Sequence, residues 1–105
     1  MDINQIFRDA VEKEASDIFI VAGLSISFKT HGVIWPQGEQ RLRADETETI
    51  IKQVYTAAGR SMQKFLEEGD DDFSFALEGA GRFRINTYKQ RGSYAMVGRV
   101  VRFTL

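Results

Sequence analysis

Apolar residues recur at a helical spacing in two long stretches of the chain. In the first stretch, Asp2 is placed to cap a helix, and Gln5 follows at the capping-box position. In the second, Asp45 and Glu48 repeat this pattern, and Gly59 stands where a helix would end. The residues predicted to face inward are Ile3, Ile6, Phe7, Ala10 and Val11 in the first helix, and Ile50, Ile51, Val54, Tyr55 and Ala58 in the second.

A short third helix is predicted between Ser61 and Gly69, with Met62, Phe65 and Leu66 facing inward. Trp35 and most of the eight phenylalanines are expected in the core. The acidic run at 67–72 is interpreted as a solvated turn, because it lacks the alternating ligand spacing of a calcium loop.

Six other segments alternate apolar with polar residues or form short β-branched runs, which predicts strands. These segments are 18–21, 25–30, 33–35, 73–77, 82–89 and 94–103. Short turns between most of them favour antiparallel pairing. With two to three helices packed on one face, the predicted fold class is α+β. The length of 105 residues fits one domain, 1–105.

The last predicted hairpin brings arginines together. A tight turn at Arg91-Gly92 sets Arg84 directly opposite Arg99 on the neighbouring strand. Because like charges in this position repel, the pair is easier to explain if an anion lies between them. Arginine suits phosphate and carboxylate oxygens. The alternative interpretation is a solvated sheet face on which acids such as Asp71 or Asp72 pair with Arg99.

The distribution of charge supports an anionic partner. The net charge is only −1, but the first 78 residues hold all 15 acidic residues against eight basic ones. From Gly79 onward there are six basic residues and no acidic one. Such an asymmetry indicates an anionic ligand or an interface for the last quarter of the chain.

Several kinds of site are excluded by composition. Without cysteine there is no thiolate zinc site and no cysteine nucleophile. His31 is the single histidine, so a paired-histidine metal site and a Ser-His-acid triad lack their parts. No G-x-x-x-x-G-K-[ST] motif is present, and 79–81 is interpreted as a hairpin turn. No apolar run is long enough to span a membrane, which favours a soluble cytoplasmic domain.

Several motifs occur together in the chain: Ala15-Ser16-Asp17-Ile18-Phe19-Ile20, Asp72-Phe73-Ser74-Phe75, Gly81-Arg82-Phe83-Arg84-Ile85-Asn86 and Gln90-Arg91-Gly92-Ser93. In order and spacing they resemble the N-terminal domain of the PilT-like ATPases, which retract type IV pili in twitching motility and belong to the type II/IV secretion ATPases. In that family histidine stands in place of Phe19, and arginine and aspartate in place of Lys29 and His31. These departures leave open whether the subgroup is a retraction motor, a retraction accessory or a conjugation-type ATPase.

The resemblance implies a PAS-like N-terminal domain, followed in the parent protein by a RecA-like domain that carries the P-loop. It implies that this chain is a fragment without catalytic or metal-ligating residues, which binds no cofactor tightly alone. The parent is expected to be a homohexameric ATPase that uses ATP and Mg²⁺. It would lie in the cytoplasm against the inner-membrane pilus or secretion platform. Independently of the resemblance, the overall acidity of the chain and the inward face expected for Phe83 argue against a nucleic-acid partner. By position in the motifs, the residues that reach the nucleotide are Arg84, Arg91 and Arg99.

Two other functions fit the sequence. A stand-alone PAS-like sensor or adaptor would hold a small ligand inside its core. An interaction module of a secretion system would dock its basic hairpin on an acidic partner without any nucleotide.

Overall fold

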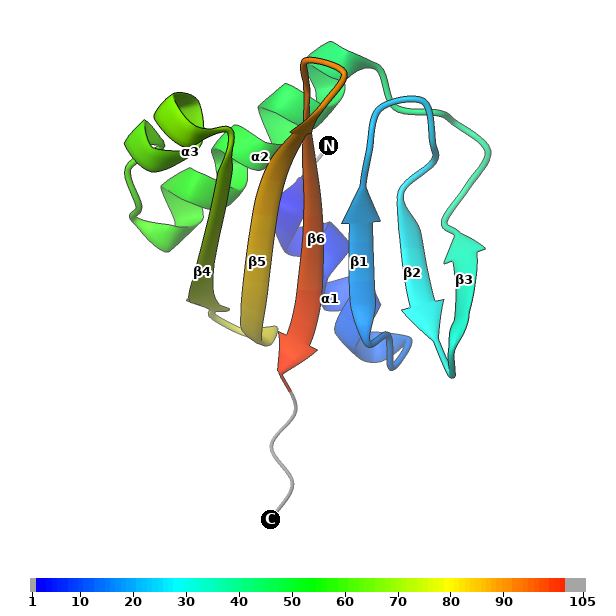
Figure 1. Cartoon of the computed structure of the whole chain (residues 1–105). Helices are drawn as coiled ribbons and strands as arrows, with labels where there is room; N and C mark the ends of the chain where they lie inside the picture. Colours follow the sequence, from blue (N-terminus) through cyan, green and yellow to red (C-terminus); the bar gives the residue numbers. More distant parts are fainter. Residues whose placement is uncertain (1, 102–105) are drawn as a thin grey trace.

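The computed structural model describes residues 2–101, which form three helices and six strands (Figure 1). The helices are α1 (Ile3–Glu12), α2 (Ala44–Ala58) and α3 (Gln63–Glu68). The strands are β1 (Asp17–Ile20), β2 (Ser27–Thr30), β3 (Val33–Pro36), β4 (Asp70–Leu77), β5 (Gly81–Gln90) and β6 (Ser93–Val101). The strand predicted at 94–103 is thus found as far as Val101, and its last two residues lie outside the described range.

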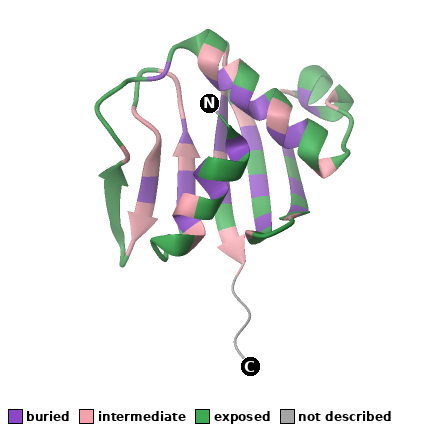
Figure 2. Ribbon diagram, turned by 180° about the vertical axis from the view of Figure 1, so that it is seen from behind, coloured by how far each residue is buried: buried purple, intermediate pink, exposed green. Residues whose placement is uncertain are grey.

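All six strands join one sheet in the order β3-β2-β1-β6-β5-β4, with antiparallel pairing throughout. The three helices cover the same face of this sheet, and the opposite face carries no helix (Figures 1 and 2). The predicted α+β class, with six strands and helices on one face, is confirmed. Since the sheet is covered on one side only, side chains alternate between a buried and a solvated face.

The core lies between the helices and the sheet. Phe7 on α1 is central to it, because its ring lies 4.6 Å from that of Phe83 and 5.4 Å from that of Phe75. Two of the predicted core positions are wrong. Trp35 is 56% exposed because it lies on the edge strand β3, and Leu66 is 51% exposed because the six-residue helix α3 buries only Phe65.

The helix ends differ in detail from the predictions. Asp2 caps α1 as expected and accepts a hydrogen bond from the Asn4 backbone N–H. Gln5 makes no capping box, because its amide donates to Asp9 instead. α2 begins two residues earlier than a cap at Asp45 would place it: Arg43 is the N-cap, and Glu46 accepts from its backbone N–H. Gly59 ends α2 in the left-handed conformation, as predicted.

Gly98 on the central strand β6 makes room for α1. A Cβ at this position would lie 3.3 Å from Ile85 Cδ1, 3.6 Å from Phe7 Cε1 and 3.8 Å from Ile18 Cβ. The helix therefore packs closely against the sheet at a residue that has no side chain.

Replacing Gly98 with valine is expected to lower the free energy of unfolding by about 1–3 kcal/mol, because two further methyl groups must displace Phe7 or Ile85. Urea denaturation of both proteins measures this difference. Gly98→Ala serves as the matched control and should cost less, since it adds only the Cβ. Equal stability of the valine variant would show that α1 does not need this close approach.

Candidate functional site: an arginine pair on the helix-free face

Arg84 and Arg99 lie side by side on the face of the sheet that no helix covers. They are direct cross-strand partners on β5 and β6, as predicted from a tight turn centred on Arg91-Gly92. Their side chains are 62% and 74% exposed. The sheet thus holds two guanidinium groups next to each other in solvent, which is the arrangement that like-charge repulsion opposes.

Each arginine has one carboxylate nearby. Arg84 Nη2 lies 3.5 Å from Asp72 Oδ2 on β4, and Arg99 Nε lies 3.6 Å from Asp17 Oδ1 on β1. Both distances exceed the roughly 2.7–2.9 Å of a tight charge-assisted hydrogen bond. The predicted alternative, a solvated sheet face with an acid beside Arg99, is found, but the acid is Asp17 rather than Asp71 or Asp72, because β1 and not β4 lies beside β6. The two guanidinium groups are therefore held loosely and keep free donors.

These four side chains border a groove of about 380 Å³ on the open face, together with Asn86 and Val97. We call Arg84, Arg99, Asp17 and Asp72 the arginine groove. Two guanidinium groups can bind phosphate or carboxylate oxygens in a bidentate manner. The two carboxylates repel a purely anionic ligand and weaken its binding. The groove is therefore better suited to be one part of a larger site than a complete phosphate site.

Arg91 lies elsewhere. It forms the tip of the β5–β6 hairpin with Gly92, and the two residues have φ angles of 53° and 82°, as a type I′ turn requires. Arg91 lies seven residue steps along the strand from Arg84, which corresponds to roughly 23 Å. The structure therefore brings together two of the three predicted arginines and places the third at the other end of the hairpin.

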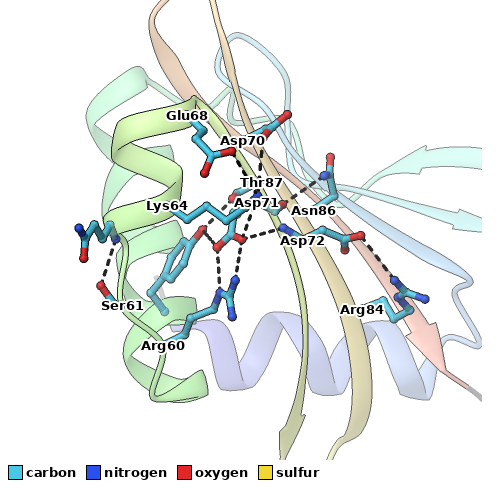
Figure 3. A network of polar contacts seen from close by, with 12 residues as sticks. Arg60, Ser61, Lys64, Glu68, Asp70, Asp71, Asp72, Arg84, Asn86 and Thr87 are labelled. Atoms are coloured by element: carbon cyan, nitrogen blue, oxygen red, sulfur yellow. Dashed lines mark hydrogen bonds and ion pairs between the residues drawn. The ribbon is translucent and has the colours of Figure 1, made fainter.

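A buried polar network was missed by the sequence analysis. Asp71, which is 2% exposed, faces the helices rather than solvent. Its carboxylate accepts hydrogen bonds from Arg60 at 2.7 and 2.9 Å and from the Tyr55 hydroxyl at 2.9 Å. Thr87 on β5 lies 2.8 Å from the same hydroxyl. The interpretation of 67–72 as a solvated turn is thus wrong for 70–72, which begin β4 (Figure 3).

The protonation states of Asp71 and Tyr55 in this network are set by their surroundings. The Arg60 guanidinium, and with it the Tyr55 hydroxyl, lowers the pKa of Asp71 to about 2 despite the burial that opposes this shift. Burial raises the pKa of Tyr55 to about 12. Neither group changes protonation near neutral pH, so the network ties α2 to β4 and β5 rather than transferring protons. Arg60 and Arg84 lie on opposite sides of the sheet (Figure 3).

The implied cofactors can be tested against the residues present. Within 2–101, no group of three or more metal-ligating side chains is placed to hold a metal ion. The arginine groove has the donors for phosphate oxygens but no cradle of backbone amides. These residues therefore fit a contribution to a nucleotide site and do not fit a complete one. Over the same residues, no helix is long and apolar enough to cross a membrane.

Comparison with known proteins identifies relatives among pilus ATPases. No protein-family model matches the chain. Two Pseudomonas aeruginosa proteins are similar in sequence: the type IV pilus ATPase PilU, 32% identical over 99 residues, and the type IV pilus retractation ATPase PilT, 28% identical over 102 residues. The alignments cover 94% and 96% of this chain but only 25% and 29% of those two proteins.

Solved structures of ATPases are similar to the chain as well. The crystal structure of the pilus retraction motor PilT with bound ADP matches the whole chain with a TM-score of 0.84 and 34% identity, over 30% of its own length. The ATPase DotB from Legionella pneumophila and from Yersinia pseudotuberculosis shares the fold, with TM-scores of 0.75 and 0.71 at 21% and 22% identity. The chain is therefore a homologue of the PilT- and PilU-type pilus ATPases and corresponds to their N-terminal region.

Proposed function

We propose that the chain is the PAS-like N-terminal domain of a motor ATPase that drives type IV pilus retraction. The homology to PilT and PilU supports this proposal, as does the share of about a quarter to a third of their length. In this proposal the parent is a cytoplasmic homohexamer at the inner-membrane pilus machine, and a RecA-like domain with a P-loop follows in the same chain. Sequencing the parent reading frame past Leu105 tests the last point.

Within this motor, Arg84 and Arg99 contribute to a composite ATP site between domains. The observation that carries this role is their pairing on the open face, exposed and only loosely held by Asp72 and Asp17. ATP with Mg²⁺ would supply the phosphoryl group to be transferred, and positive charge near that group stabilises its transfer. The sheet positions the two guanidinium groups, and the two carboxylates keep them oriented when no nucleotide is near.

The parent protein with both Arg84→Ala and Arg99→Ala is expected to hydrolyse ATP about tenfold or more slowly, because two charge-assisted contacts are lost. Turnover and nucleotide affinity are measured together. Arg41→Ala, in the loop between β3 and α2, is the control for removal of one exposed arginine. Unchanged turnover and affinity in the double variant would rule out this role for the pair.

A second function is favoured by the two carboxylates beside the arginines. A groove that carries both signs of charge fits a polar protein surface, so the arginine groove could serve as a docking site between subunits instead. The same double variant separates the two roles. Loss of ring assembly without nucleotide indicates docking, whereas an intact ring with weak nucleotide binding indicates a nucleotide contact.

A further inference from the structure

A second groove lies on the side of the sheet that the helices cover, opposite the arginine pair. It has a volume of about 600 Å³ and runs between α1 and the loop that joins β3 to α2. Ile6, Phe28 and Leu42 form its apolar floor. We call it the acidic groove, because Asp2, Asp9 and Glu39 line it.

The carboxylates of the acidic groove are not neutralised by ion pairs within 2–101. Asp2 caps α1, and Asp9 accepts a hydrogen bond from Gln5 at 2.7 Å. Glu39 is exposed and makes no hydrogen bond or ion pair with the part of the chain described. Two cations lie by the groove: Lys13, whose ammonium donates to Gln37 at the rim, and Arg41, which stands between the lining residues Gln40 and Leu42. The groove thus combines an apolar floor with an excess of negative charge, which favours a basic occupant.

The chain itself supplies such an occupant. Between 79 and 101 every charged residue is basic. At the tip of the β5–β6 hairpin, Arg91 is exposed, and no ion pair joins it to any residue within the described range. The turn consists of only two residues, so the tip is narrow and ends in one guanidinium. A narrow basic tip is complementary in shape and charge to an acidic groove.

We infer that the hairpin tip of one copy docks in the acidic groove of the next, with Arg91 facing Glu39. The two surfaces share no residue, so one contact between two copies leaves a free tip and a free groove. Repeated head-to-tail, the contact leads to a ring or a filament, whereas two reciprocal contacts close a dimer. This inference uses the charge distribution and the groove, and it is independent of the nucleotide role of Arg84 and Arg99. It gives a function to the one predicted arginine that lies apart from them.

Sedimentation velocity tests the inference on the unsubstituted 105-residue chain and on two single variants of it, Arg91→Glu and Glu39→Lys. Each variant alone places like charges in the contact, so its self-association at low salt should weaken about tenfold or more. An equimolar mixture should associate again with the two variants in alternation. Native Arg91 of one variant meets native Glu39 of the other, and the two substituted positions also carry opposite charges. Glu78→Lys, in the exposed β4–β5 turn, is the control and should behave as the unsubstituted 105-residue chain.

The inference would be overturned if the unsubstituted 105-residue chain were monomeric at all concentrations. It would also be overturned if each variant associated as well alone as in the mixture. A paramagnetic label gives an independent readout, because the chain has no cysteine and Gln90→Cys creates a single attachment site beside the tip. Labelled copies should broaden amide signals of 2–9 and 37–42 in unlabelled copies. Broadening confined to other residues would also contradict the docking.

Discussion

Phe7→Ala is expected to lower the free energy of unfolding by about 3–5 kcal/mol, the range found for large aromatic deletions in cores. Phe7 is 1% exposed and packs between the rings of Phe75 and Phe83. Gly98 leaves no side chain on β6 that could fill the space. Because the Phe7 ring contacts Phe75 on β4 and Phe83 on β5, the cavity removes a central contact between α1 and the sheet.

Equilibrium urea denaturation checks this prediction, with Leu24→Ala as the matched control. Leu24 is 56% exposed, so its truncation should change stability by no more than about 0.5 kcal/mol. A domain of this size is typically stable by about 5–15 kcal/mol, so the Phe7 variant should be close to its unfolding limit. A loss similar to that of the control would show that α1 contributes little to the core.

Asp71→Asn is expected to cost about 3 kcal/mol, because it removes the charge that Arg60 neutralises inside the protein. It should also change the pH dependence of stability. The pKa of Asp71 is lower in the folded protein than its ordinary value of 3.8, so its stabilisation is present above about pH 4. That stabilisation, about 2 kcal/mol, is lost as the pH falls toward the folded pKa of about 2.

Unfolding free energies measured from pH 6 down to pH 2 test both parts. As the pH falls from 6 to 2, the Asp71→Asn variant should lose less free energy of unfolding than the unsubstituted chain. Asp70→Asn, one residue earlier and exposed, is the matched control and should keep nearly the parent stability. Parallel pH curves for the parent chain and the Asp71 variant would contradict the low pKa of Asp71.

The hairpin register could be read from the sequence because it depends on local chemistry alone. A two-residue turn at Arg91-Gly92 fixes every pair along β5 and β6, including Arg84 with Arg99. The helices followed from their apolar spacing in the same way. The exact caps could not be predicted in this way, because the Asp45 carboxylate accepts a hydrogen bond from the Arg43 side chain instead of capping the first turn of α2.

The partners of the arginines could not be predicted, since they depend on which strands are neighbours. Asp17 reaches Arg99 only because β1 lies beside β6, and the two strands are far apart in the sequence. The burial of Asp71 did leave a signal. It stands two residues before Phe73 and four before Phe75, so strand periodicity places it on the buried face. Three consecutive aspartates obscured this.

We propose that Arg84 and Arg99 reach the nucleotide in the complete motor. A structure of the parent protein with bound ADP tests it most directly. We predict that at least one of the two guanidinium groups lies within ion-pair distance, about 4 Å, of a phosphate oxygen. Both arginines remaining on Asp17 and Asp72, with the nucleotide out of reach, would contradict the claim.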